Sequence, residues 1–234
     1  YIKVSRKLAK ENVLLFLIII AIMITPTTGF CNNTIQTTQH IIVIDPGHGG
    51  IETGIVSSGG LTEKTIVLKL AQKTAQQLET RYNVLLTRNQ DVDIPFQERI
   101  FFTNKNKADL FLSIHLHDSI KPSFFLYYFD LPESYERLTP AGNNTWKSQP
   151  LIHQADCKQA VNSFLSIFSA DKTAVRFFSK GAPIILLEGA TMAAILIEPL
   201  SISTLSRHPE EIETILDEYA LLISKSIDLY FKKK

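Results

Sequence analysis

The segment Ile41-Ile-Val-Ile-Asp-Pro-Gly-His-Gly-Gly50 places four consecutive β-branched residues before a turn rich in glycine. An apolar run of this length between polar flanks is typical of a strand that is buried on both faces, as in a parallel sheet. The turn carries His48, and open α/β sheets bind their ligands at the carboxyl ends of the strands. The glycines allow a sharp turn and leave room beside the imidazole. The segment therefore predicts a buried strand with a ligand site at its end.

Outward from this segment, apolar runs alternate with amphipathic stretches, which predicts an α/β domain with a mostly parallel sheet flanked by helices. Further strands are expected at 82–87, 110–116, 123–129, 174–178, 183–187 and 193–198, and helices at 62–81, 96–107, 154–170 and from 209 onward. Thr62 is expected to cap the first helix, and Pro209 to begin the last one. The 234 residues suffice for one such domain.

Three segments far apart in the chain carry the residue types of a hydrolytic zinc site. They contain His48, Glu63 at the start of a helix, and the pair His115 and His117. Two imidazoles and one carboxylate can hold zinc and leave a fourth position for water. Alternation along an extended strand places His115 and His117 on one face, so the sequence leaves open which of them is the ligand.

Glu198 ends the apolar run 193–197 and is followed by Pro199. Burying an unpaired carboxylate costs free energy, so this glutamate is expected either to form a structural salt bridge or to move a proton in catalysis. The chain contains no His-Glu-x-x-His and no Gly-x-Ser-x-Gly, the signatures of thermolysin-like enzymes and of serine hydrolases. The pattern indicates a metallohydrolase whose ligands come from distant segments.

The overall charge argues against nucleic acid as a partner. The formal net charge is +1, and the basic residues are scattered except at the two ends. The turn around His48 also lacks the spacing of a phosphate-binding loop, because neither Gly-x-Gly-x-x-Gly nor Gly-Lys-Ser/Thr occurs there.

Residues 1–30 have the pattern of a signal peptide or, as the alternative, of an uncleaved N-terminal anchor. Four basic residues precede the apolar run 13–24, which is short for a membrane span. We therefore expect an exported protein, periplasmic or extracellular, that touches the membrane only through this segment if it is uncleaved. Cys31 could be lipidated, although Phe30 fits that poorly, or it could pair with Cys157 after export.

In chain order, six motifs resemble the zinc-dependent N-acetylmuramoyl-L-alanine amidases. They lie at residues 43–50, 63–64, 84–88, 98–99, 108–115 and 195–198. The resemblance spans nearly all of residues 41–234 and implies a catalytic domain at 38–234 with a twisted six-stranded sheet. It also implies that zinc is held by His48, Glu63 and His115, and that Glu198 is the catalytic carboxylate.

The resemblance implies the substrate as well: the peptidoglycan amide that joins N-acetylmuramic acid to the L-alanine of the stem peptide. A monomer is expected. The chain departs from the family at His117, which replaces an asparagine, at Leu187-Glu188, where an arginine is usual, and at Ser203-Thr204, where Ser-Asn is usual. These departures bear on substrate affinity and on the preferred stem peptide. The loop at 130–150 has no assigned role.

Two alternatives remain open at the level of sequence. One is a cell-wall binding protein that keeps the fold and has lost turnover, which the altered positions would suit. The other is an exported zinc peptidase that cuts between amino acids of the stem peptide. Retention of all four site residues favours the amidase.

Overall fold

One six-stranded sheet organises the molecule. The computed structural model describes residues 39–131, 146–171 and 176–234, which belong to one compact unit. The strands are β1 (Ile41–Pro46), β2 (Asn83–Leu86), β3 (Leu110–Ile114), β4 (Ser123–Phe129), β5 (Arg176–Ala182) and β6 (Ala193–Glu198). Their order is β2-β1-β3-β6-β4-β5, and every neighbouring pair is parallel except β4 and β6. This confirms the expected six-stranded, mostly parallel sheet.

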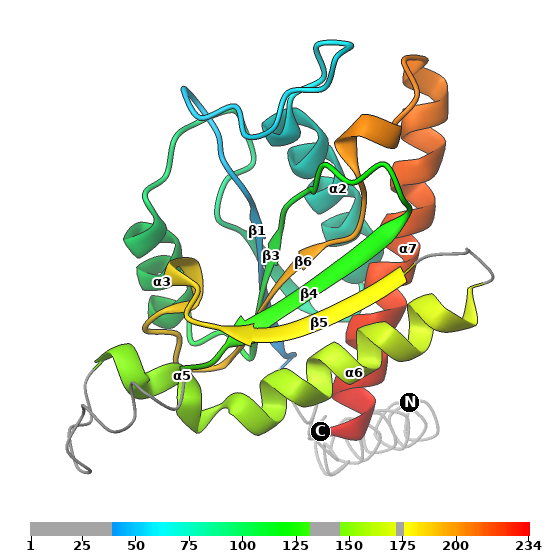
Figure 1. The fold of residues 1–234 in the computed structure, drawn as a ribbon. Helices are drawn as coiled ribbons and strands as arrows, with labels where there is room; N and C mark the ends of the chain where they lie inside the picture. Colours follow the sequence, from blue (N-terminus) through cyan, green and yellow to red (C-terminus); the bar gives the residue numbers. More distant parts are fainter. Residues whose placement is uncertain (1–38, 132–145, 172–175) are drawn as a thin grey trace, which may run out of the picture. The chain divides into compact units, whose positions relative to one another are not determined.

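Helices cover the sheet on both faces (Figure 1). One face packs against α2 (Glu63–Leu78), α6 (Gln154–Ala170) and α7 (Pro209–Lys233), and the other against α3 (Phe96–Lys105) and the 3-10 helix η2 (Ile185–Leu187). Shorter elements are η1 (Trp146–Ser148), α5 (Gln149–Ile152) and η3 (Ile202–Thr204). The layered α/β architecture is therefore as the sequence predicted.

Residues 41–44 of β1 show why this part of the strand is apolar. Ile42 and Ile44 are buried in the cluster under α2 and α7, whereas Val43 is buried in the cluster under α3. Successive side chains of a strand point to opposite faces, so each of these positions meets an apolar cluster. A polar residue in such a strand needs buried hydrogen-bond partners, as Asp45 has. Each such buried aliphatic side chain contributes about 1.5–3 kcal/mol, which favours the position of β1 inside the sheet, between β2 and β3.

The prediction of a strand at 183–187 is wrong. Strand β5 already occupies Arg176–Ala182 as the edge strand, and the chain then turns, with the Ile184 amide donating to the Ala182 carbonyl at 2.8 Å. The following apolar residues form η2, in which Leu186 and Leu187 are buried and Ile185 is 63% exposed. An apolar run of this length is compatible with a short helical turn as well as with a strand. The strand expected at 174–178 lies partly outside the described residues and begins, as β5, at Arg176.

Several predicted boundaries shift. Helix α2 ends at Leu78 rather than at 81, α3 ends at Lys105 rather than at 107, and β3 ends at Ile114 rather than at 116. The Thr62 side chain does not cap α2; its hydroxyl bonds to that of Thr65 at 2.8 Å.

The predictions for the N-terminal segment lie outside the described residues. This applies to the signal peptide or anchor at 1–30 and to Cys31, and most of the loop at 130–150 is likewise outside them. In the described ranges, no helix is both long and apolar enough to cross a membrane. Cys157 carries a free thiol that is buried under β6, where its sulfur accepts the amide of Ala194 at 3.3 Å.

Candidate metal centre

The turn after β1 aims His48 at the end of the neighbouring strand. The Gly47 amide donates to the Ile114 carbonyl at 3.0 Å, which ties the turn to β3. A side chain at Gly47 would overlap the ring of His115, so only glycine allows the two segments to approach this closely. His48 itself has a φ of 59°, in the left-handed region that non-glycine residues seldom adopt. The surrounding structure must therefore hold this residue in place.

Two buried arginines hold the turn by its backbone carbonyls. Arg99 of α3 donates from Nη1 to the Pro46 carbonyl and from Nη2 to the His48 carbonyl, both at 2.9 Å. Arg88, which follows β2, donates from Nε to Pro46 at 3.0 Å and from Nη2 to Gly47 at 2.7 Å. Three successive carbonyls are thus fixed by guanidinium groups, whose planar shape allows several hydrogen bonds at once.

Asp45 anchors one of these arginines from inside the sheet. Its carboxylate is 0% exposed and accepts from Arg99 Nη1 at 2.9 Å, from Thr87 Oγ1 at 2.5 Å and from Ser113 Oγ at 2.8 Å. A buried charge is tolerated only where its hydrogen bonds are made, and this one is fully paired. The network offsets the strain of the left-handed backbone at His48.

His48, Glu63 and His115 meet at the ends of β1 and β3. Glu63 Oε1 lies 3.2 Å from His48 Nε2 and 3.1 Å from His115 Nδ1. One donor atom from each of the three residues lies within 4.8 Å of the others. For zinc bonds of about 2.0–2.1 Å, neighbouring ligand atoms of a tetrahedron lie about 3.3 Å apart. The two measured separations match that spacing, so the residues present fit a zinc ion.

Glu63 is held ionised by its neighbours. Burial by itself would raise the pKa of this carboxyl, but hydrogen bonds from His115 and His48 and from the amides of Ile55 and Leu116 hold its pKa well below the ordinary value. Both amides donate at 3.0 Å, one to each oxygen. The position at the first turn of α2 adds the positive end of the helix dipole. A buried, negatively charged ligand is therefore ready for a cation.

His117 has other partners than His115. Its Nδ1 accepts the Ser119 amide at 3.1 Å, so its Nε2 carries the proton and donates to the Ser123 carbonyl at 2.7 Å. Burial lowers the pKa of this imidazole. Because β3 stops at Ile114, the alternation expected to align the two histidines does not continue to residue 117, which forms only an isolated bridge with Ser201. Both of its nitrogens are used within the protein.

Glu198 stands at the end of β6 in a different environment. Burial and the charge of Glu63 raise the pKa of this carboxyl from 4.5 to about 7. Among the described residues, none makes a hydrogen bond or an ion pair with it, so the structural salt bridge considered from the sequence is absent there. Phe125 lies directly opposite Glu198 on the antiparallel strand β4. The carboxyl is thus near a negative neighbour and an aromatic ring.

Comparison with known proteins shows the family to which this chain belongs. A family model described as N-acetylmuramoyl-L-alanine amidase matches residues 42–220, which include all four predicted site residues. The chain belongs to this family. The matched range also includes both arginines that hold the turn, so the whole arrangement described above lies within the amidase match.

Two relatives show how far the likeness extends. The N-acetylmuramoyl-L-alanine amidase AmiC of Neisseria meningitidis serogroup B is 48% identical over 84 residues, which are 36% of this chain and 20% of that protein. The endolysin of Bacillus phage SPP1 is 32% identical over 165 residues, which are 69% of this chain and 55% of the endolysin. The chain thus spans less than two thirds of the length of either relative.

Solved structures support the same fold. The amidase AmiC2 of Nostoc punctiforme has a TM-score of 0.61 at 23% identity, covering 82% of this chain and 97% of that one. The catalytic domain of the amidase CwlV from Paenibacillus polymyxa has a TM-score of 0.62 at 22% identity, covering 84% and 100%. At these identities the likeness concerns the fold.

Sequence reasoning gave no role to Arg88 and Arg99, which hold the amidase turn. Both lie in motifs that carried the resemblance, yet each reads as a surface cation when only its neighbours in the chain are considered. The available signal was position: Arg88 follows a strand end, and Arg99 interrupts the apolar side of α3 next to the buried Ile100. A charged residue on a buried face requires a partner.

Of the departures from the family pattern, Glu188 lies beside a groove of about 330 Å³ between α3 and η2, lined also by Phe101, Trp146 and Ile185. Ser203 bonds through its hydroxyl to Asp118, which ties η3 to the loop after His117. None of these residues belongs to the group formed by His48, Glu63 and His115.

Proposed function

We propose that this chain is a zinc-dependent amidase that hydrolyses the bond between N-acetylmuramic acid and the L-alanine of peptidoglycan stem peptides. One observation carries the proposal. A buried group of two histidines and an ionised glutamate lies close enough to Glu198 for the charge of Glu63 to raise the pKa of Glu198. A ligand group beside a carboxyl of shifted pKa is the expected constellation of a metallohydrolase.

His48, Glu63 and His115 would hold the zinc ion. When bound there, zinc supplies a Lewis acid for the amide carbonyl and lowers the pKa of water toward neutrality. Groups behind two of the ligands would help to hold them in place. Glu63 is fixed by two backbone amides, and the exposed Glu52 lies 3.8 Å from Nδ1 of His48, the ring nitrogen turned away from Glu63. Such partners set the orientation and tautomer of a ligand.

Glu198 would move the proton. Its carboxylate takes a proton from the attacking water as the water oxygen bonds to the lactyl carbonyl carbon. The same proton then passes to the alanine nitrogen as the carbon–nitrogen bond breaks, which releases a free lactyl carboxyl group and the stem peptide. A pKa of about 7 suits both steps, because the group must accept and donate at neutral pH.

The place of action follows from the same proposal. Peptidoglycan lies outside the cytoplasm, and the basic residues before the apolar run 13–24 are those of an exported protein. We propose that the domain at 38–234 acts there as a monomer, with peptidoglycan as its partner. A reporter that works only after export, fused behind residues 1–40, should become active. Retention of the intact fusion in the cytoplasm would contradict this part of the proposal.

Digestion of purified peptidoglycan tests the activity. The full chain, loaded with zinc, should release stem peptides whose new amino terminus is L-alanine, and free lactyl carboxyl groups should appear in equal number. Glu198→Gln serves as the matched control, since it keeps the size of the side chain. New amino termini within the stem would indicate the peptidase instead, and tight binding without any product would indicate the binding protein.

A further inference from the structure

Strands β4 and β5 carry a row of aromatic and cationic side chains on the sheet face turned away from α6. Phe124 and Leu126 of β4 are buried in the cluster with α6. Because side chains alternate along a strand, Phe125 and Tyr127 lie on the opposite face. The parallel register places Arg176, Phe178 and Lys180 of β5 beside Ser123, Phe125 and Tyr127. We call these five residues the β4–β5 surface: Phe125, Tyr127, Arg176, Phe178 and Lys180.

This surface begins at the proposed proton carrier. Phe125 is paired with Glu198 across the antiparallel strands, and Tyr127 with Leu196. Directly opposed residues of neighbouring strands share a face and have Cβ atoms about 4.5–5.5 Å apart. In agreement, burial and the charge of Glu198 together raise the pKa of the Tyr127 hydroxyl. The β4–β5 surface and the proposed reaction centre are therefore continuous.

Stacked rings give the surface a fixed shape. The rings of Phe125 and Phe178 lie 4.9 Å apart at 14°, and those of Phe125 and Tyr127 lie 6.4 Å apart at 6°. His117 meets the edge of Phe125 at 4.9 Å and 75°. Mutual stacking restricts each side chain, so a ligand that binds here loses little free energy in ordering them. Phe178 nevertheless remains 47% exposed on the edge strand.

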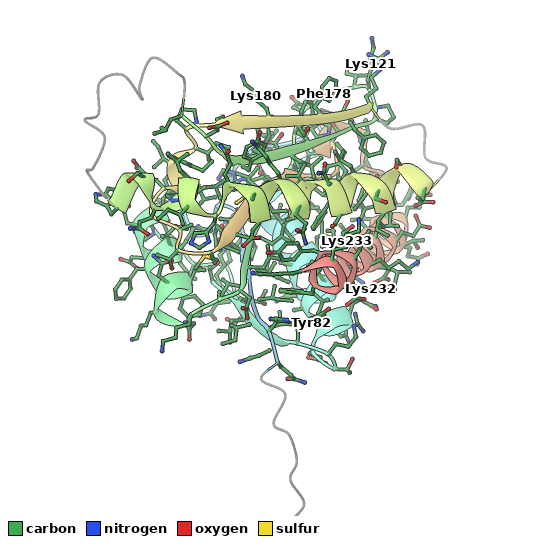
Figure 2. The ribbon with its side chains drawn as sticks, turned by 90° about the horizontal axis from the view of Figure 1, so that it is seen from below. Tyr82, Lys121, Phe178, Lys180, Lys232 and Lys233 are labelled. Atoms are coloured by element: carbon green, nitrogen blue, oxygen red, sulfur yellow. The ribbon has the colours of Figure 1, made fainter. Side chains whose placement is uncertain are left out.

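Positive charge accompanies the rings. Arg176 and Lys180 are exposed on β5, and Lys121 is exposed in the loop that enters β4, whose Pro122 carbonyl accepts the Arg176 amide. Figure 2 shows Lys121, Phe178 and Lys180 on the side of the strands away from α6. Among the described residues, no acidic side chain forms an ion pair with Lys121, Arg176 or Lys180. The surface thus presents unpaired cations next to apolar rings.

We propose that the β4–β5 surface binds the peptide stem of the substrate, with Arg176 and Lys180 pairing to its carboxylates and the aromatic rings contacting its alkyl groups. The inference rests on the proposed function. The scissile amide joins a sugar to a peptide, and the two sides differ in charge. The N-acetyl sugars are neutral once the lactyl carboxyl is in the amide, whereas the stem carries free carboxylates, so unpaired cations select the peptide side.

Two matched substrates test this inference. One is a muramoyl peptide whose stem carboxylates are free, and the other is the same compound with those carboxylates amidated. The variants are Arg176→Gln with Lys180→Gln, and separately Phe178→Ser. The matched control is Lys225→Gln, an exposed lysine on α7. Far-ultraviolet circular dichroism and thermal unfolding verify that each variant is folded.

The double variant should raise KM for the acidic substrate by about tenfold and leave kcat nearly unchanged, since charged hydrogen bonds contribute in the ground state as well. For the amidated substrate it should have little effect. Phe178→Ser should raise KM for both substrates. The Lys225 variant should match the parent. An equal loss for acidic and amidated substrates in the double variant, or no loss for either, would overturn the assignment.

Binding separates a failure of this inference from a failure of the proposed function. Calorimetry with the zinc-loaded Glu198→Gln protein reports affinity for the acidic and amidated compounds without turnover. A preference for the acidic compound that disappears when Arg176 and Lys180 are also replaced supports the surface, even if the parent cleaves neither compound. Cleavage by the parent together with no such preference would refute the surface and leave the amidase standing.

Discussion

Two carboxylates of the candidate site, Glu63 at the start of α2 and Glu198 at the end of β6, have opposite environments. Glu63 is 2% exposed and is approached by two imidazoles and two backbone amides. Glu198 makes no hydrogen bond with any described residue. It lies opposite Phe125 of the neighbouring strand. The pKa of the first is lowered and that of the second is raised to about 7. Burial alone therefore does not set the role of a carboxylate; its hydrogen-bond partners do.

The difference corresponds to a division of labour. A metal ligand must stay ionised, which hydrogen bonds and the amino terminus of α2 ensure. A proton carrier must change its charge near neutral pH, which a partly desolvated carboxyl beside a negative neighbour can do. Glu63, whose pKa is lowered, contacts the turn that Arg88 and Arg99 hold, whereas Glu198, whose pKa is raised, lies opposite β4. Four predictions test whether this division holds.

The largest effect is expected on the ligand side. His48→Ala removes one of three zinc ligands, so zinc occupancy should fall below half, and hydrolysis should drop by about a thousandfold or more. Elemental analysis of the purified protein measures the metal. His117→Ala is the control: because its ring nitrogens bond to Ser119 and Ser123, most of the zinc should remain. Full occupancy in His48→Ala would refute the ligand assignment.

Arg99→Met should also have a large effect, mainly by lowering the free energy of unfolding. It leaves Asp45 buried without its cation, and breaking a buried pair in this way costs about 3–5 kcal/mol. It also releases the Pro46 and His48 carbonyls, so zinc affinity should fall in the molecules that remain folded. Urea unfolding and zinc titration measure the two effects. Arg81→Met, at an exposed ion pair with Asp228, should cost at most about 1 kcal/mol.

Glu198→Gln should separate binding from catalysis. The amide keeps the shape of the side chain and cannot take the proton, so hydrolysis should fall by roughly a hundredfold or more. Zinc content should stay at the level of the parent, because this carboxyl is not among the three ligands. Turnover within a factor of a few of the parent would assign the proton transfer to another group.

The smallest effect concerns the pH dependence of stability in zinc-free protein. The folded-state pKa of Glu198, about 7, lies above the ordinary 4.5. The protonated carboxyl therefore favours folding below pH 4.5, and this contribution is lost as the pH rises through 7. At pH 8, Glu198→Gln should be more stable than the parent by at most about 3 kcal/mol, and at pH 4.5 the two should be alike.

Urea unfolding with a chelator at both pH values measures this difference. The exposed Glu79→Gln, at the end of α2, controls for the loss of one negative charge. A Glu198→Gln protein whose advantage over the parent is the same at both pH values would show that the carboxyl is not strained in the folded state. The contrast between Glu63 and Glu198 would then lose its physical basis.

The sequence by itself determined the strands that are built on apolar runs, because a strand buried on both faces accepts mainly apolar residues. It also determined the helices with strong periodicity and the four residues offered for the site. The run at 183–187 was misassigned because a short apolar stretch is compatible with several structures, and only the occupied edge at β5 decides among them. The choice between His115 and His117 likewise depends on where β3 stops.

Only the tertiary structure decided the contacts between distant segments. The arginine network joins residues 45–48 to residues 88 and 99, and the register of β4 against β6 places Phe125 opposite Glu198. Neither follows from local pattern, because hydrogen bonds and desolvation depend on which atoms meet in space. The opposite pKa shifts of Glu63 and Glu198 arise from these contacts, since the neighbours of a glutamate decide whether it is ionised or protonated.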